Sequence, residues 1–212
     1  MNARRNTPTL LLMLGLAWGV LPIFGASVKN SSPTITLRIV NEAGVDQRTL
    51  SRAGSEAAAI LGRSGVKLIW LTCEAGWADP TSLNPCRQQT GPLEFWFFVV
   101  GRKPRGKSTE MVGFTDWNES SNHGLAGVYY PAAVELARKY RTDCDAYQIL
   151  GAAIAHEVGH LLLGENTHSS LGLMLAVWDL PQVKRISTGA LNFSSDQSKR
   201  LQYAIRIRNE SR

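Results

Sequence analysis

The residues of this chain that are best suited to chemistry are three histidines and one glutamate. The segment His156-Glu157-Val158-Gly159-His160 is followed eight residues later by His168. Residues four apart lie on one face of a helix about one turn apart, so the imidazoles of His156 and His160 can bind one cation from the same side. Three imidazoles and one open position are typical of a catalytic zinc site, and we predict Zn²⁺ at His156, His160 and His168.

Glu157 has the position of a general base. It follows His156 directly and therefore points about 100° around the helix from it. From there its carboxylate can reach a water on the metal without being a ligand itself. Zinc lowers the pKa of such a water to about 7, so the glutamate can take its proton during attack on a carbonyl group and pass it to the departing amine. The pattern predicts a zinc peptidase.

A buried helix must position these groups. The residues on both sides of the motif, from 146 to 163, are largely apolar, which is typical of a helix buried on all sides. Asp143 or Asp145 can cap its N-terminus, and Gly164 follows its last residue as a break. Imidazoles and a carboxylate left unpaired in such a helix would cost on the order of several kcal/mol, whereas a bound dication and its water would satisfy them.

The segment HEVGHLLLGENTHSSLGLM, residues 156–174, resembles the zinc-binding segment of the metzincin metallopeptidases. The pattern of that family is HExxHxxGxxH followed by a turn that contains methionine. The resemblance implies that His156, His160 and His168 are the metal ligands and that Glu157 is the general base. It also implies that Gly164 is the glycine at the helix exit and that Met174 is the turn methionine.

The spacing of the segment differs from the family pattern. The steps from His160 to Gly164 and from Gly164 to His168 are each one residue longer, and one additional helical residue turns the helix exit by about 100°. In its longer form, HExGHLLLGxxxHSxxGxM, the segment resembles the corresponding segment of a group of bacterial secreted proteins. In that group a tryptophan follows the segment, as Trp178 does here. The resemblance covers roughly residues 112–202.

Residues 124–131, GLAGVYYP, form a predicted strand that proline ends. This strand resembles the metzincin edge strand beside the cleft. The resemblance implies that the main chain of Leu125, Ala126 and Gly127 binds an extended peptide. On strand propensity alone, an ordinary core strand is an equal alternative.

The remaining patterns predict one α+β domain over residues 28–212. Strands are expected at 34–40, 66–71 and 93–100, a helix at 46–63, and a last helix after the capping box of Ser194 and Gln197. A mixed twisted sheet with the motif helix against one face and a small C-terminal helical part would follow. The metzincin resemblance implies the same layout, with the zinc between the two parts.

The first 27 residues predict export. Arg4 and Arg5 precede an apolar stretch, residues 10–24, and small residues follow, which is the order of a signal peptide. The stretch is short for a membrane span, although an uncleaved anchor is an alternative. Without these two arginines, 21 of the 23 basic residues remain against 17 acidic ones, a net charge of +4. No nucleic-acid-binding signature accompanies this excess, so nucleic acid is not an expected partner.

Three cysteines in an exported chain predict one disulfide. Cys73 and Cys86 flank a loop rich in turn residues, and a bridge between them would close it in an oxidising compartment. Cys144 would then be free or would join another chain.

The function that we predict is that of a secreted or periplasmic zinc endopeptidase, a monomer acting on a peptide or protein substrate. One alternative keeps the enzyme but takes Asp179 as the third ligand in place of His168. The other is a non-catalytic zinc-binding or interaction module. Closed structural zinc sites favour four protein ligands rich in cysteine, and no fourth ligand is evident in the sequence.

Overall fold

The computed structural model describes residues 32–74, 81, 83–106, 111–118, 123–164 and 167–210. The predicted signal peptide, residues 1–27, lies outside these ranges. The strands and the short 3₁₀ helix are β1 (Thr34–Asn41), β2 (Lys67–Cys73), η1 (Pro85–Arg87), β3 (Glu94–Val100), β4 (Gly113–Asn118) and β5 (His123–Tyr129). The α-helices are α1 (Gln47–Arg63), α2 (Tyr130–Lys139), α3 (Ala146–Leu163), α4 (Leu180–Ser187) and α5 (Ser195–Glu210).

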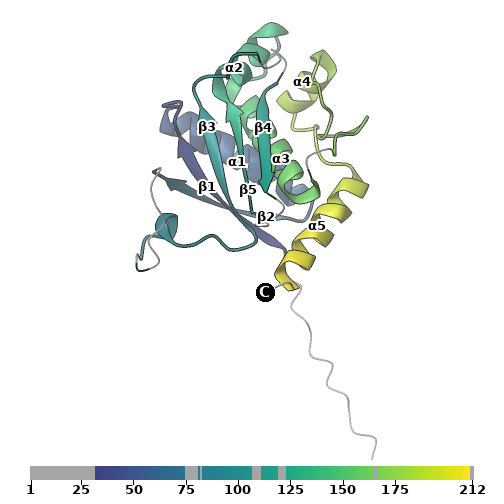
Figure 1. Cartoon of the computed structure of the whole chain (residues 1–212). Coiled ribbons are helices and arrows are strands. Elements are labelled where there is room, and N and C mark those ends of the chain that lie inside the picture. The colour runs from purple at the N-terminus through teal and green to yellow at the C-terminus, as the bar shows by residue number, and fades with distance from the viewer. Residues whose placement is uncertain are drawn as a thin grey trace, which may run out of the picture. The chain divides into compact units, whose positions relative to one another are not determined.

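The strands form a five-stranded mixed sheet in the order β2-β1-β3-β5-β4, as Figure 1 shows. β1, β2, β3 and β5 are parallel, and β4 pairs with β5 in the antiparallel direction. The predicted mixed sheet is therefore confirmed. Its two outer strands are β2 and β4.

The expectation that residues 124–131 form the edge strand is wrong. β5 lies inside the sheet, where Leu125 pairs with Trp96 of β3 on one side and with Asp116 of β4 on the other. Ala126 and Gly127 are paired on both sides in the same way. Because both sides of this main chain are used, it cannot accept an added peptide strand, and β4 has the edge position instead.

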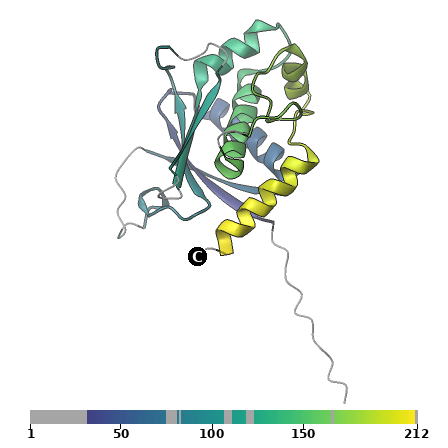
Figure 2. The same cartoon turned by 45° about the vertical axis from the view of Figure 1, so that its right-hand side comes forward.

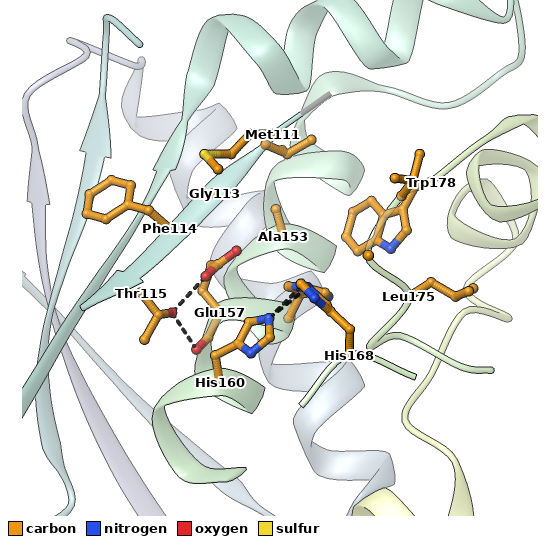
Figure 3. Close-up of a pocket in the computed structure, with 14 residues that line it drawn as sticks. Met111, Gly113, Phe114, Thr115, Ala153, Glu157, His160, His168, Leu175 and Trp178 are labelled. Carbon is orange, nitrogen blue, oxygen red and sulfur yellow. Dashed lines mark hydrogen bonds between the residues drawn. The ribbon is translucent and has the colours of Figure 1, made fainter. Parts of the chain in front are cut away.

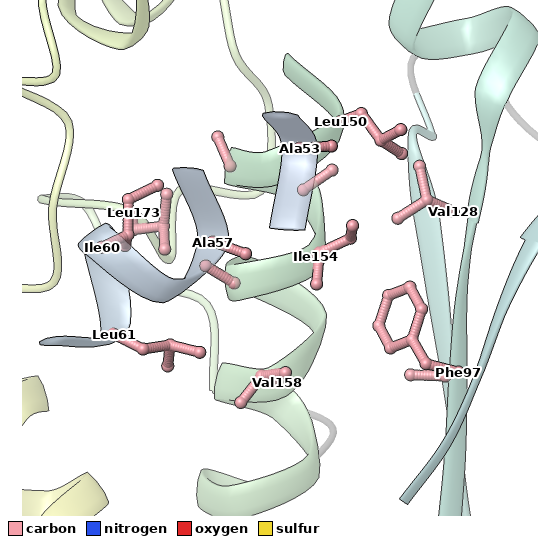
Figure 4. Close-up of a cluster of buried hydrophobic side chains, with 14 of the residues drawn as sticks. Ala53, Ala57, Ile60, Leu61, Phe97, Val128, Leu150, Ile154, Val158 and Leu173 are labelled. Atoms are coloured by element: carbon pink, nitrogen blue, oxygen red, sulfur yellow. The ribbon is translucent and has the colours of Figure 1, made fainter. Parts of the chain in front are cut away.

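Two helices, α1 and α3, cover one face of the sheet (Figure 2). β3 alternates as expected for a strand with one covered face, because Phe95, Phe97 and Val99 are buried. α1 turns its own buried stripe toward α3, with Ala53, Ala57, Ile60 and Leu61 (Figure 4). Because α3 packs against α1, α2, α5 and the strands β4 and β5, its residues 149–162 are all buried, which confirms the helix predicted around the motif.

The chain directly after β5 differs from the prediction. The strand ends at Tyr129, and Pro131 lies in the first turn of α2 rather than at the end of the strand. Proline is well suited to that place because the first turn of a helix does not need its N–H group. The last helix, α5, begins where the sequence indicates: the main-chain N–H of Ser194 donates to Gln197 Oε1, and that of Gln197 donates to Ser194 Oγ.

Cys73 and Cys86 form the predicted disulfide, with their Cα atoms 5.5 Å apart. Cys144 is free and buried, and burial raises the pKa of its thiol to about 11. Across the part of the chain that the structure describes, no helix is both long enough and apolar enough to cross a membrane.

Candidate metal centre

Helix α3 holds two of the three histidines and the glutamate. It begins after Asp145, whose side chain and that of Gln148 form a capping box. It ends at Gly164, where φ is +102° and the main-chain N–H donates to the carbonyl of His160 at 2.9 Å. A residue with a side chain rarely adopts this φ, so the glycine lets the chain leave the helix and return toward the motif.

The three predicted ligands converge on one point. His160 Nε2 lies 3.0 Å from His156 Nε2 and 3.1 Å from His168 Nε2. In a tetrahedral zinc site with Zn–N bonds of 2.0–2.1 Å, two ligand nitrogens are separated by about 3.3 Å. Among the described residues, no other histidine, cysteine or carboxylate joins this group. Figure 3 shows His160 and His168 meeting beside Glu157.

The outer ring nitrogens of two histidines have hydrogen-bond acceptors beside them. His156 Nδ1 lies 2.8 Å from the main-chain oxygen of Leu173, so we assign the proton to this nitrogen. The Thr167 hydroxyl donates to the carbonyl of Gly164 at 2.6 Å, which leaves its oxygen able to accept from His160 Nδ1 at 3.3 Å. Both imidazoles then carry a lone pair on Nε2.

These assignments make a cation the natural partner of the group. The lone pairs of His156 Nε2 and His160 Nε2 face each other at 3.0 Å and repel, and neither of these two nitrogens has a proton to lie between them. Burial and the neighbouring His160 lower the pKa of His156 to about 3, so protonation near neutral pH does not relieve the contact. Neutral imidazoles whose far nitrogen donates to the protein are the usual ligands of zinc, so the donor set fits this metal.

The Glu157 carboxylate lies next to the histidines in a buried position. Only 6% of the residue is exposed, and its Oε2 accepts a hydrogen bond of 2.7 Å from the hydroxyl of Thr115 on β4. Burial raises the pKa of this carboxyl group to about 7, although the Thr115 hydrogen bond acts in the opposite direction. Glu157 is not one of the converging ligands, which leaves its carboxylate available as a base.

The segment around Met174 supports two of the ligands from below. The Leu173 carbonyl holds His156, and the Met174 carbonyl accepts from the main-chain N–H of Ser169, the neighbour of His168. The Met174 side chain is fully buried against the helix at Gly159, where an added Cβ would lie 2.4 Å from its sulfur. Met174 therefore packs against α3 at Gly159, beside His160, and its role as a turn methionine stays a prediction.

A pocket of about 400 Å³ opens over the histidines. It lies between β4, α3 and the segment after Met174, and its walls are mostly apolar. The Trp178 ring forms part of the wall, with its centroid 5.6 Å from that of His156 and almost perpendicular to it. The lining residues are Met111, Val112, Gly113, Phe114, Thr115, Ala153, His156, Glu157, His160, His168, Leu175, Ala176, Val177 and Trp178.

Sequence reasoning missed the contribution of β4 to the site. Gly113, Phe114 and Thr115 line the pocket, whereas Leu125, Ala126 and Gly127 do not. The alternative ligand Asp179 is not in the histidine group; it is exposed and forms a capping box with Gln182 at the start of α4.

No protein-family model and no curated protein matches this sequence. Among solved structures, the fold is similar to that of a zinc-dependent peptidase from Methanocorpusculum labreanum (strain Z), with a TM-score of 0.50 and 13% identity over 78% of this chain and 99% of that chain. An archaemetzincin from Methanopyrus kandleri matches with a TM-score of 0.46 and 15% identity over 84% of this chain and 99% of that chain. At these identities, the first likeness shows the fold.

Proposed function

We propose that this chain is an exported zinc-dependent endopeptidase that acts as a monomer on peptides or proteins. The observation that carries the proposal is the meeting of three Nε2 atoms in the pocket that also holds the buried carboxylate of Glu157. His156, His160 and His168 would hold the metal. A fold shared with a zinc-dependent peptidase is consistent with this arrangement.

When bound, zinc would polarise a substrate carbonyl group and lower the pKa of a coordinated water to about 7. Glu157 would accept the proton that the attacking water releases and deliver it to the leaving amine. In the metal-free protein, burial raises the pKa of this carboxyl group to about 7, and a bound zinc ion would favour its ionised form, which can accept the proton. Glu157 is buried, and the pocket that it lines has mostly apolar walls.

An extended peptide is the substrate that this cleft would accept. β4 is the outer strand of the sheet on the side of the pocket, and three of its residues line the pocket. An outer strand can pair its main chain with a peptide of almost any sequence. The apolar residues Ala153, Leu175 and Trp178 would then receive one side chain of that peptide.

Two observations support the proposal of export. Residues 1–27 have the order of charged, apolar and small residues found in signal peptides. The Cys73–Cys86 disulfide is typical of proteins that fold in an oxidising compartment.

Metal removal tests this function. We expect purified protein to contain roughly one zinc ion per chain and to cleave a mixed peptide library. A chelator should abolish cleavage, and added zinc should restore it, as measured by mass spectrometry of the products. Cleavage that persists after the metal has been removed would contradict the proposal, as would fully zinc-loaded protein that cleaves no peptide in the library.

A further inference from the structure

Two residues of β4 enclose the carboxylate of Glu157 from the side of the sheet. Thr115 donates its hydroxyl to Oε2 at 2.7 Å, and the same hydroxyl lies 3.3 Å from the main-chain oxygen of Glu157. Gly113, two residues earlier on the same face of the strand, leaves space for the rest of the carboxylate. An added Cβ at Gly113 would lie 2.4 Å from Oε1 and 2.7 Å from Cδ of Glu157.

We propose that Thr115 is a positioning residue that fixes the orientation of the Glu157 carboxylate, so that Oε2 is held by β4 and Oε1 is the oxygen that handles the proton. This inference rests on the proposed function, in which Glu157 is the base. Figure 3 shows one carboxylate oxygen of Glu157 joined to Thr115 and the other pointing away from it.

Among the described residues, Thr115 is the one that donates a hydrogen bond to this carboxylate. Glu157 lies on a buried helix and in a pocket with mostly apolar walls. A glutamate side chain has several rotatable bonds, and a buried carboxylate without a hydrogen-bond donor turns toward any polar group or water that it can reach. The hydroxyl selects one of these orientations, and Gly113 makes that orientation sterically possible.

The location of Thr115 links the base to the substrate. β4 is the outer strand with which an extended peptide would pair, and Thr115 and Gly113 are two of its residues. The strand that holds the peptide therefore also sets the position of the carboxylate. This arrangement keeps the base and the scissile carbonyl group in register, which proton transfer over hydrogen-bond distance requires.

The test compares Thr115→Val with Thr115→Ser. Valine keeps the shape and the strand propensity but removes the donor, whereas serine keeps the donor. The matched control is Thr36→Val on β1, which β3 and β5 separate from β4. We expect all three proteins to bind zinc as the wild type does, because no ligand is changed. If Thr115→Val does not fold, Thr115→Ala replaces it.

In peptide cleavage, we expect Thr115→Val to lose about tenfold or more in kcat with little change in KM, and we expect Thr115→Ser and Thr36→Val to stay within about threefold of the wild type. Crystal structures should show the Glu157 carboxylate rotated away from β4 in Thr115→Val and unmoved in Thr115→Ser. An unmoved carboxylate in Thr115→Val, or a Thr115→Ser variant as impaired as Thr115→Val, would overturn the inference.

These measurements separate the inference from the proposed function. If the wild type cleaves peptides, Glu157→Gln does not, and Thr115→Val retains full kcat, the function stands and the inference fails. If the wild type cleaves nothing, the function fails, and the carboxylate positions in the crystal structures still decide whether Thr115 orients Glu157.

Discussion

Two ionisable residues of the site, Glu157 and His156, respond to burial in opposite directions. Burial favours the neutral form of each, so the pKa of Glu157 rises from 4.5 to about 7 and that of His156 falls from 6.5 to about 3. In metal-free protein, the contribution of the Glu157 carboxyl group to the free energy of unfolding is fully present below pH 4.5 and is lost as the pH rises to 7. The contribution of the His156 imidazole to the free energy of unfolding is fully present above pH 6.5 and is lost as the pH falls toward 3.

The substitution Glu157→Gln isolates the first of these effects. Glutamine keeps the shape but has no charge to bury, so the variant should not lose stability between pH 4.5 and 7 on this account. With chelator present, we expect the free energy of unfolding of the variant relative to wild type to increase by on the order of 3 kcal/mol from pH 4.5 to pH 7.5. Urea unfolding at the two pH values measures it.

His156 is common to both proteins in that comparison, so its contribution cancels. A difference between variant and wild type that is the same at both pH values would show that the Glu157 carboxyl group is not buried as described.

At the scale of elements, the site depends on how closely α3 packs on the segment that follows it. The Leu173 carbonyl orients His156, and the Met174 side chain fills the space left by Gly159. Gly159 is therefore needed for its small size, within a helix where glycine otherwise lowers stability.

Replacing Gly159 by alanine should separate these two elements. The added methyl group would collide with Met174, whose sulfur lies 2.4 Å from the Cβ position, and with the ring of Phe193 at 3.0 Å. We expect a loss of about 1–3 kcal/mol in the free energy of unfolding, together with weaker zinc binding because Leu173 moves away from His156. Urea unfolding with chelator and zinc competition titration measure the two effects.

The matched control is Gly62→Ala on α1, where nothing lies within 4 Å of an added Cβ. It should leave zinc binding unchanged and stabilise the protein by about 0.5–1 kcal/mol, the usual gain of alanine over glycine in a helix. A Gly159→Ala variant that behaves like this control would contradict the packing described for Met174.

The elements that the sequence predicted well are those with a strong periodic pattern. In β1, apolar residues alternate with polar residues along most of the strand, and in β3 buried residues alternate with partly buried ones. In α1, the buried residues follow the helical repeat, so in all three elements the pattern marks the buried face. β4 was missed because it is short and mixes glycine, acidic and aromatic residues, and α2 was missed because Pro131 indicated a strand end. β5 was predicted as a strand but given the wrong neighbours, since a strand pattern contains no information about sheet order.

At the scale of the whole molecule, the fold brings three separate segments to one pocket. The proposed metal ligands and the proposed base could be picked out because they lie within 13 residues of sequence and follow the helical repeat. Thr115 and Gly113 could not, because they are about 40 residues away and reach Glu157 only after β4 has joined the sheet beyond β5. The proposed metal-binding residues can thus be recognised from a short stretch of sequence, whereas the residues that would orient the proposed base are brought to it only by the sheet topology.

The central claim is that a metal at the three histidines and the Glu157 carboxylate together cleave peptide bonds. Cleavage of a peptide library by wild type and by Glu157→Gln, each at the same measured zinc content, tests it most directly. We expect the variant to keep its zinc and to lose at least about 100-fold in kcat/KM, because the base is removed while the ligands remain. A zinc-loaded variant that cleaves as fast as wild type would contradict the claim.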